Sequence, residues 1–237
     1  MSAILEIKGL RGGYTPGVEI LRGVDITLQQ GEACGIIGLN GSGKSTLGKA
    51  IMNMIPIRSG QILFKGVDVT NLTTSELANR GLAIMLQGGQ VFPNLSVLEN
   101  LQLAYGNNPD KKQIAVLEAT IPLLVAPKKI LQGKMADKLS GGQRHQLALA
   151  MTLAQCPQIV ILDEPSAGLS PSAVNDLYIL LAKVRHVLGI TILLIEQNIN
   201  RAIDFCDQCL LIKQGYISTE VVNKDIQSVK KLIFTRL

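Results

Sequence analysis

Apolar and polar residues alternate near the start of the chain, whereas short continuous apolar runs recur further on. Residues 4–8 and 18–28 alternate as antiparallel strands with one wet face do. From residue 33 the pattern changes to apolar strand, glycine-rich loop and helix, and strands are expected near residues 82–86, 158–163, 191–195 and 209–213. This alternation predicts an α/β fold with a mostly parallel, doubly wound sheet and an N-terminal antiparallel β segment.

The strand pattern is interrupted between residues 87 and 156. Helical spacing of apolar residues dominates there, around residues 97–103, 112–124 and 142–155. We therefore expect a single domain over residues 1–237. Residues 1–86 and 157–237 would form its α/β core, and residues 87–156 an inserted helical subdomain.

The composition is that of a globular cytosolic protein. The chain has 237 residues, of which 47% are hydrophobic and 17% charged, enough to bury a large core. No apolar run approaches the ~20 residues of a membrane helix, and the first residues lack the pattern of a signal peptide. The excess of 23 basic over 18 acidic residues is spread along the chain and indicates ordinary solvated surface.

The four cysteines are too few and too scattered for a disulfide framework, which suits a reducing compartment. Cys206 and Cys209 do have the spacing of metal ligands. A structural zinc site usually takes two further ligands, and neither His145 nor His186 is close in sequence. We interpret the pair as structural.

A glycine-rich loop after the apolar residues 34–37 carries the strongest chemical signal. Residues 38–46 match G-x-x-x-x-G-K-[ST] between a predicted strand and a predicted helix, which is the context of a P-loop. The alternative is a glycine-rich turn with a lysine by chance, but such a turn would not require a strand before it and a helix after it. The loop predicts binding of ATP or GTP through backbone N–H groups, with Lys44 on the phosphates and Ser45 on Mg²⁺. The predicted ATP-binding residues here are Gly38, Asn40, Gly41, Ser42, Gly43, Lys44, Ser45 and Thr46.

Two carboxylates follow the apolar run 159–162. Because α/β sheets place their ligands at the carboxyl ends of strands, Asp163 is expected to hold Mg²⁺ through water. Glu164 is expected to act as general base, or to orient the attacking water. Taken alone, the pair could equally be a polar strand end. The P-loop in the same chain favours the catalytic interpretation.

A third motif, Leu139-Ser140-Gly141-Gly142-Gln143, resembles the signature sequence of ABC transporter ATPases. With the P-loop, Gln87 and the Asp163-Glu164 pair, the chain is similar to that family over nearly its full length. The resemblance implies a P-loop NTPase of the ABC type that forms a head-to-tail dimer. Each ATP would lie between the P-loop of one protomer and the trans-protomer contacts Ser140, Gly141, Gly142 and Gln143 of the other.

The resemblance also assigns roles to single positions. Tyr14 would stack on adenine, Gln87 would sense Mg²⁺ and water and link the site to the membrane partner, and residues 166–170 would cross the dimer interface. Gln197 stands where the family usually has a histidine. Its amide can donate a hydrogen bond to the γ-phosphate but cannot carry a positive charge, so we expect a smaller contribution to catalysis.

Residues 91–100, 166–171 and 193–198 resemble the ATPases of branched-chain amino acid importers, whose relatives move urea and other amides. This implies two membrane permeases, an indirect solute-binding protein, a homodimer or a dimer with a sibling ATPase, and no nucleic acid. The chain would work in the cytoplasm, on the inner face of the membrane. Two alternatives remain: a soluble non-transport ABC ATPase, and a regulatory subunit that binds nucleotide without hydrolysis. Glu164 argues against the second.

Overall fold

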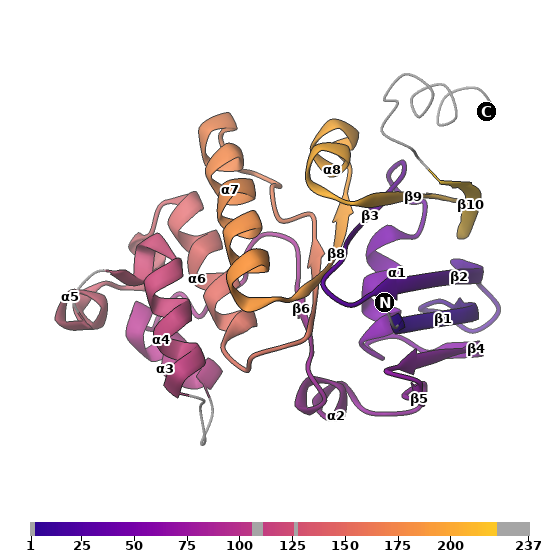
Figure 1. Ribbon diagram of the computed structural model, residues 1–237, viewed down its shortest axis with the longest axis horizontal. Helices are drawn as coiled ribbons and strands as arrows, with labels where there is room; N and C mark the ends of the chain where they lie inside the picture. The colour runs from indigo at the N-terminus through magenta and orange to yellow at the C-terminus, as the bar shows by residue number, and fades with distance from the viewer. Residues whose placement is uncertain (1–2, 106–110, 126–127, 222–237) are drawn as a thin grey trace. The chain divides into compact units, whose positions relative to one another are not determined.

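The computed structural model describes residues 3–105, 111–125 and 128–221. The chain divides into two compact units, residues 1–77 with 191–237 and residues 78–190. Figure 1 labels the helices and strands of both units.

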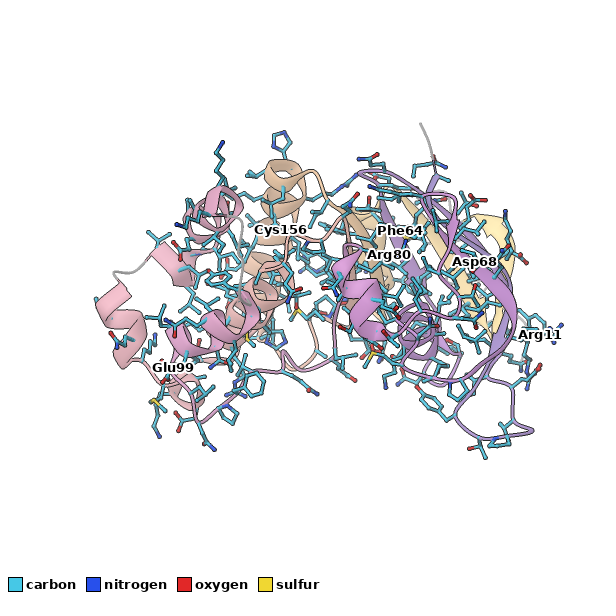
Figure 2. The ribbon with its side chains drawn as sticks, turned by 90° about the horizontal axis from the view of Figure 1, so that it is seen from below. Arg11, Phe64, Asp68, Arg80, Glu99 and Cys156 are labelled. Atoms are coloured by element: carbon cyan, nitrogen blue, oxygen red, sulfur yellow. The ribbon has the colours of Figure 1, made fainter. Side chains whose placement is uncertain are left out.

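The first unit opens with an antiparallel sheet. Its strands lie in the order β2-β1-β4-β5. In β1 and β2, buried and exposed positions largely alternate, as the sequence predicts for a sheet with one wet face. Phe64, labelled in Figure 2, is buried at the end of β4, so its ring belongs to the core beneath the sheet. The strands are β1 (Ala3–Gly12), β2 (Leu21–Gln29), β4 (Ile57–Phe64) and β5 (Val67–Asp68).

A second group of strands in this unit carries the loops that matter for function. β3 (Ala33–Ile37) lies between β8 (Thr191–Glu196) and β9 (Gln208–Lys213) and is parallel to both. β10 (Tyr216–Val221) pairs antiparallel with β9. Every residue of β3 and β8 is buried, which explains the continuous apolar residues 33–37 and 192–195.

Short helices cover these strands. α1 (Lys44–Ile51) packs against β8, and α8 (Ile199–Phe205) packs against β3, β8 and β9. α2 (Thr74–Asn79) ends the first stretch of this unit. α1 ends at Ile51, because the chain turns just beyond it at Asn53, which has a positive φ of 51°.

The second unit combines two parallel strands with helices. β6 (Leu82–Met85) pairs with β7 (Ile159–Asp163) in parallel register. α3 starts with a capping box in which Ser96 and Glu99, the latter labelled in Figure 2, bond each other's backbone and side chain. The helices are α3 (Val97–Tyr105), α4 (Lys111–Thr120), α5 (Lys128–Gly133), α6 (Gly141–Leu153) and α7 (Pro171–Leu188), with 3₁₀ turns at Pro122–Val125 and Ala136–Lys138.

The structure confirms the predicted α/β class and the N-terminal antiparallel sheet. The helix expected over residues 112–124 is wrong at its end: α4 stops at Thr120, and a 3₁₀ turn follows from Pro122, whose ring nitrogen cannot donate a helical hydrogen bond. β4, β5, β10 and α7 were not predicted from the sequence. The boundaries 87–156 for a helical subdomain stay a prediction, since the second unit also contains β6, β7 and α7.

Within the described part of the chain, no helix is long and apolar enough to cross a membrane.

Candidate functional site

The predicted P-loop connects β3 to α1 in the first unit. Gly43 occupies the position before α1 with φ of 108°, a left-handed conformation that glycine adopts without strain. The amino group of Lys44 is buried and donates to the carbonyl oxygens of Gly38 and Leu39, each at 2.9 Å. The lysine therefore lies folded across its own loop.

The loop is supported from below by β9 and the turn that follows it. A Cβ atom at Gly38 would lie 2.3 Å from the carbonyl oxygen of Ile212, so only glycine fits there. Gly215 N–H donates to the carbonyl of Ser42 at 2.9 Å, and the buried Ser42 Oγ has no hydrogen-bond partner among the described residues. This curled backbone at a helix N-terminus fits the phosphates of a nucleotide, which need convergent N–H donors and a close approach.

Tyr14 and Gln197 belong to the same unit as the P-loop. Tyr14 is half exposed, and Lys49 Nζ of α1 lies 5.7 Å from the centre of its ring. Gln197 is exposed directly after β8. The carboxylate of Glu196, itself buried, accepts hydrogen bonds from the N–H groups of Gln197 and Asn198 at 2.8 and 3.1 Å. The turn that presents Gln197 is thus fixed by two hydrogen bonds to a buried side chain.

The carboxylate pair and Gln87 come together in the second unit. Asp163 and Glu164 are both buried at the carboxyl end of β7. Glu164 has a positive φ of 47°, uncommon for a residue with a side chain and a form of strain found at functional positions. Gln87 Nε2 donates to Glu164 Oε2 at 2.9 Å. The amide therefore orients the carboxylate predicted to act on water.

The Leu139–Gln143 segment forms the start of α6. Ser140 is the N-cap, and its Oγ accepts from Gln143 N–H at 3.3 Å. Gln143 Oε1 in turn accepts from Ser140 N–H at 3.3 Å and from Lys134 Nζ at 3.2 Å. This capping box holds a helix N-terminus in a fixed form, with Ser140 and Gly141 exposed.

His145 links this helix to the loop that carries Gln87. Its Nδ1 lies 3.0 Å from the carbonyl oxygen of Gly141, so Nδ1 carries the proton, since a carbonyl only accepts. A Cβ atom at Gly89 would lie 3.2 Å from the His145 ring. The ring is buried, and its Nε2 has no hydrogen-bond partner within the part of the chain that the structure describes.

Comparison with known proteins agrees with this geometry. The ABC transporter family matches residues 21–167. The probable branched-chain amino acid transport ATP-binding protein LivF of Archaeoglobus fulgidus is 35% identical over 91% of this chain and 90% of its own length. The chain belongs to the ABC transporter family.

A second relative and a solved structure support the same family. The high-affinity branched-chain amino acid transport ATP-binding protein BraG of Pseudomonas aeruginosa is 31% identical over 86% of this chain and 87% of its own. Among solved structures, cbiO1 of Clostridium perfringens has a TM-score of 0.82 at 27% identity, covering 100% of this chain and 96% of its own. The chain is thus an ABC transporter ATPase, which couples ATP hydrolysis to transport.

The structure places the predicted site residues of this ABC ATPase in two groups. The P-loop, Tyr14 and Gln197 lie in one unit, and Gln87, Asp163, Glu164 and the Ser140–Gln143 segment in the other. The roles given to the individual residues stay predictions.

Two residues beside the site were not singled out from the sequence as site residues. Glu196 ends an apolar strand, as Asp163 does, and that pattern could have identified it. His145 follows the signature segment by two residues. Nothing in its spacing indicated a contact with Gly89, because the two residues are distant in sequence.

Proposed function

We propose that this ABC ATPase drives an importer of branched-chain amino acids or of related amino acids and amides. The observation that carries the proposal is the similarity to LivF and BraG over most of both chains. The proposal is also supported by three segments that resemble that branch, residues 91–100, 166–171 and 193–198.

In this proposal the P-loop holds the phosphates of ATP. Lys44 exchanges its two carbonyl partners for phosphate oxygens, which carry more charge and bond an ammonium more strongly. Tyr14 stacks on adenine after its contact with Lys49 is released. Gln197, the neutral replacement of a histidine, donates to the γ-phosphate.

The proposed Mg²⁺ ligands are Ser45, Gln87 and, through water, Asp163. A hydroxyl, an amide oxygen and a carboxylate are the hard oxygen donors that Mg²⁺ prefers, so these residue types fit the ion. The ion would neutralise charge on the phosphates. Glu164, steadied by Gln87, orients the attacking water and accepts its proton.

Two such chains, or this chain and a sibling ATPase, would dimerise head to tail. The exposed N-terminus of α6 at Ser140 and Gly141 then completes the ATP site of the other protomer. ATP favours the closed dimer because it binds both protomers at once, and hydrolysis removes that bridge. The difference between the affinities of the closed and open dimers for ATP supplies the free energy that is passed to the permeases.

The permeases would dock beside residues 87–100. Phe92 and Leu103 expose large apolar side chains there, 52% and 58% accessible. Gln90, Leu86 and Met151 line a hollow in the same unit. Apolar side chains around a hollow suit a short cytoplasmic segment of a permease. The ATPase would then lie on the inner face of the membrane, and a solute-binding protein would feed the permeases from the other side.

Uptake in the native cell tests this proposal. A strain lacking this chain should lose uptake of labelled leucine, isoleucine or valine. Wild-type protein should restore it, and the Lys44→Ala variant should not. Restored uptake of urea alone would move the substrate to the amides. No transport defect in the deletion strain for either class of solute would contradict the importer.

A further inference from the structure

Two of the four cysteines lie together in the first unit. Cys206 caps the C-terminus of α8, and Cys209 is the second residue of β9. Both are free thiols and both are buried. They belong to no part of the ATP site described above.

The two sulfur atoms share one small space, above the backbone of Gly35. A Cβ atom at Gly35 would lie 2.7 Å from Cys209 Sγ and 3.2 Å from Cys206 Sγ. In the parallel register Gly35 is the partner of Cys209. A side chain at this position of β3 would fill the space that the thiols occupy, so the glycine leaves them side by side.

The turn between the cysteines is held on both sides. Asp207 N–H donates to the carbonyl of Ala33 at 2.8 Å, and Asp207 Oδ2 accepts from Ala33 N–H at 2.8 Å. Cys206 N–H completes the last turn of α8 by donating to Ala202 at 2.8 Å. The backbone that carries both thiols is therefore fixed against β3 before any reaction.

The third buried thiol, Cys34, takes no part. It is the neighbour of Gly35 on β3 and therefore points to the opposite face of the sheet. No group of three or more histidine, cysteine or acidic side chains in the described residues could hold a metal ion. Cys206 and Cys209 are the two thiols that share the space beside Gly35.

We propose that Cys206 and Cys209 form a dithiol site that peroxide converts reversibly to a disulfide. The thiolate of Cys209 attacks one oxygen of hydrogen peroxide, forming a sulfenic acid and releasing hydroxide. The sulfur of Cys206 then displaces the sulfenic oxygen, which leaves as water. Together the two thiols lose two electrons and two protons, and peroxide becomes two molecules of water. A small thiol reverses the reaction by exchange.

The electrostatics of the pair agree with these roles. A hydrogen bond from the Cys206 thiol lowers the pKa of Cys209, which favours its thiolate. The same contact, together with burial, raises the pKa of Cys206 far above its usual range. These directions favour Cys209 as the attacking thiolate and Cys206 as the resolving thiol.

A disulfide here would act on the P-loop through β9. β9 contains both Cys209 and Ile212, and the carbonyl of Ile212 packs against Gly38. Gly215, in the turn after β9, donates a hydrogen bond to the carbonyl of Ser42. A covalent bond at the start of β9 and beside β3 shifts the two strands that support the loop. We expect oxidation to weaken ATP binding at least about fivefold, in the range of ordinary coupling between sites.

The test uses the full chain, reduced and then treated with hydrogen peroxide. Peptide mapping by mass spectrometry should find a Cys206–Cys209 disulfide that dithiothreitol removes. ATP affinity should fall on oxidation and return on reduction. The Cys156→Ser variant should behave as wild type, and Cys209→Ser should be insensitive. Phenylarsine oxide, which bridges adjacent thiols, should bind the unmodified wild-type protein and so test proximity without any substitution.

Oxidation confined to Cys156, or failure of the arsenical to bind the reduced protein, would overturn the site. A disulfide that leaves ATP affinity unchanged would overturn its link to the P-loop. Neither result depends on the transported solute, so this test can fail while the importer assignment stands.

Discussion

Gln87 donates a hydrogen bond to Glu164, with Nε2 and Oε2 2.9 Å apart, although 77 residues separate them in sequence. The bond fixes a buried carboxylate whose backbone is already held at a positive φ. A carboxylate held by a hydrogen-bond donor keeps a fixed direction, which is required of a residue that positions water. This contact joins the carboxylate predicted to act on water to Gln87, the residue predicted to link the ATP site to the permease.

Replacing Glu164 by Gln should stop hydrolysis while ATP binding is retained. The amide keeps the shape and the contact with Gln87 but cannot accept a proton, so we expect the rate to fall about 10²- to 10⁴-fold. In the presence of ATP, dimers of the variant should accumulate, and size-exclusion chromatography should detect them. Asp204→Asn, which makes the same change at an exposed carboxylate on α8, is the control. Unchanged turnover in Glu164→Gln would remove this residue from the mechanism.

Gln197→Ala should slow hydrolysis more than it weakens ATP binding. Loss of a donor that acts on developing charge costs up to ~10²- to 10³-fold in rate. The turn itself should survive, because Glu196 bonds backbone N–H groups that alanine retains. Single-turnover hydrolysis and nucleotide titration separate the two effects. Activity equal to wild type would make the position a spectator.

Ser140→Ala should affect both stability and catalysis. Loss of the N-cap costs about 1 kcal/mol of the free energy of unfolding. Ser96→Ala is a matched control, because Ser96 forms a capping box at α3 of the same kind. The two variants should lose comparable stability in chemical denaturation. Only Ser140→Ala should lose ATPase activity in the isolated protein, and equal activity losses would place Ser140 outside the ATP site.

Alanine substitutions at Gly88 and Gly89 distinguish the effect of backbone strain from the effect of contact with His145. Both have a positive φ, 87° and 59°, so alanine at either costs roughly 1–2 kcal/mol. A Cβ atom at Gly88 meets nothing within 4 Å, whereas one at Gly89 presses on the His145 ring. We expect Gly89→Ala to lower ATPase activity well below that of Gly88→Ala at similar thermal stability. Matching rates would show that His145 does not connect the loop to α6.

Local pattern was enough to predict the P-loop and the Asp163-Glu164 pair, since both depend on a few residues at fixed spacing after an apolar strand. The contact of Gln87 with Glu164, and that of His145 with Gly89, depend on how distant segments pack. No local pattern encodes such packing. β4 was missed because Ser59, Gly60 and Gln61 interrupt its apolar alternation, and it forms by pairing with β1.

The pair of cysteines is a second feature that the sequence alone could not predict. Their spacing suggested metal ligands, and the lack of a second pair in sequence argued against a metal. Gly35 brings the two sulfurs together from a strand far away in the chain. The juxtaposition of two thiols is visible only once β3 and β9 are paired.

The most direct test of transport is the isolation of this chain, tagged and gently extracted, from native membranes, followed by mass spectrometry of what accompanies it. The account predicts two permeases with membrane-spanning helices, with or without a sibling ATPase. Purely water-soluble companions would contradict the importer and leave only the ATPase.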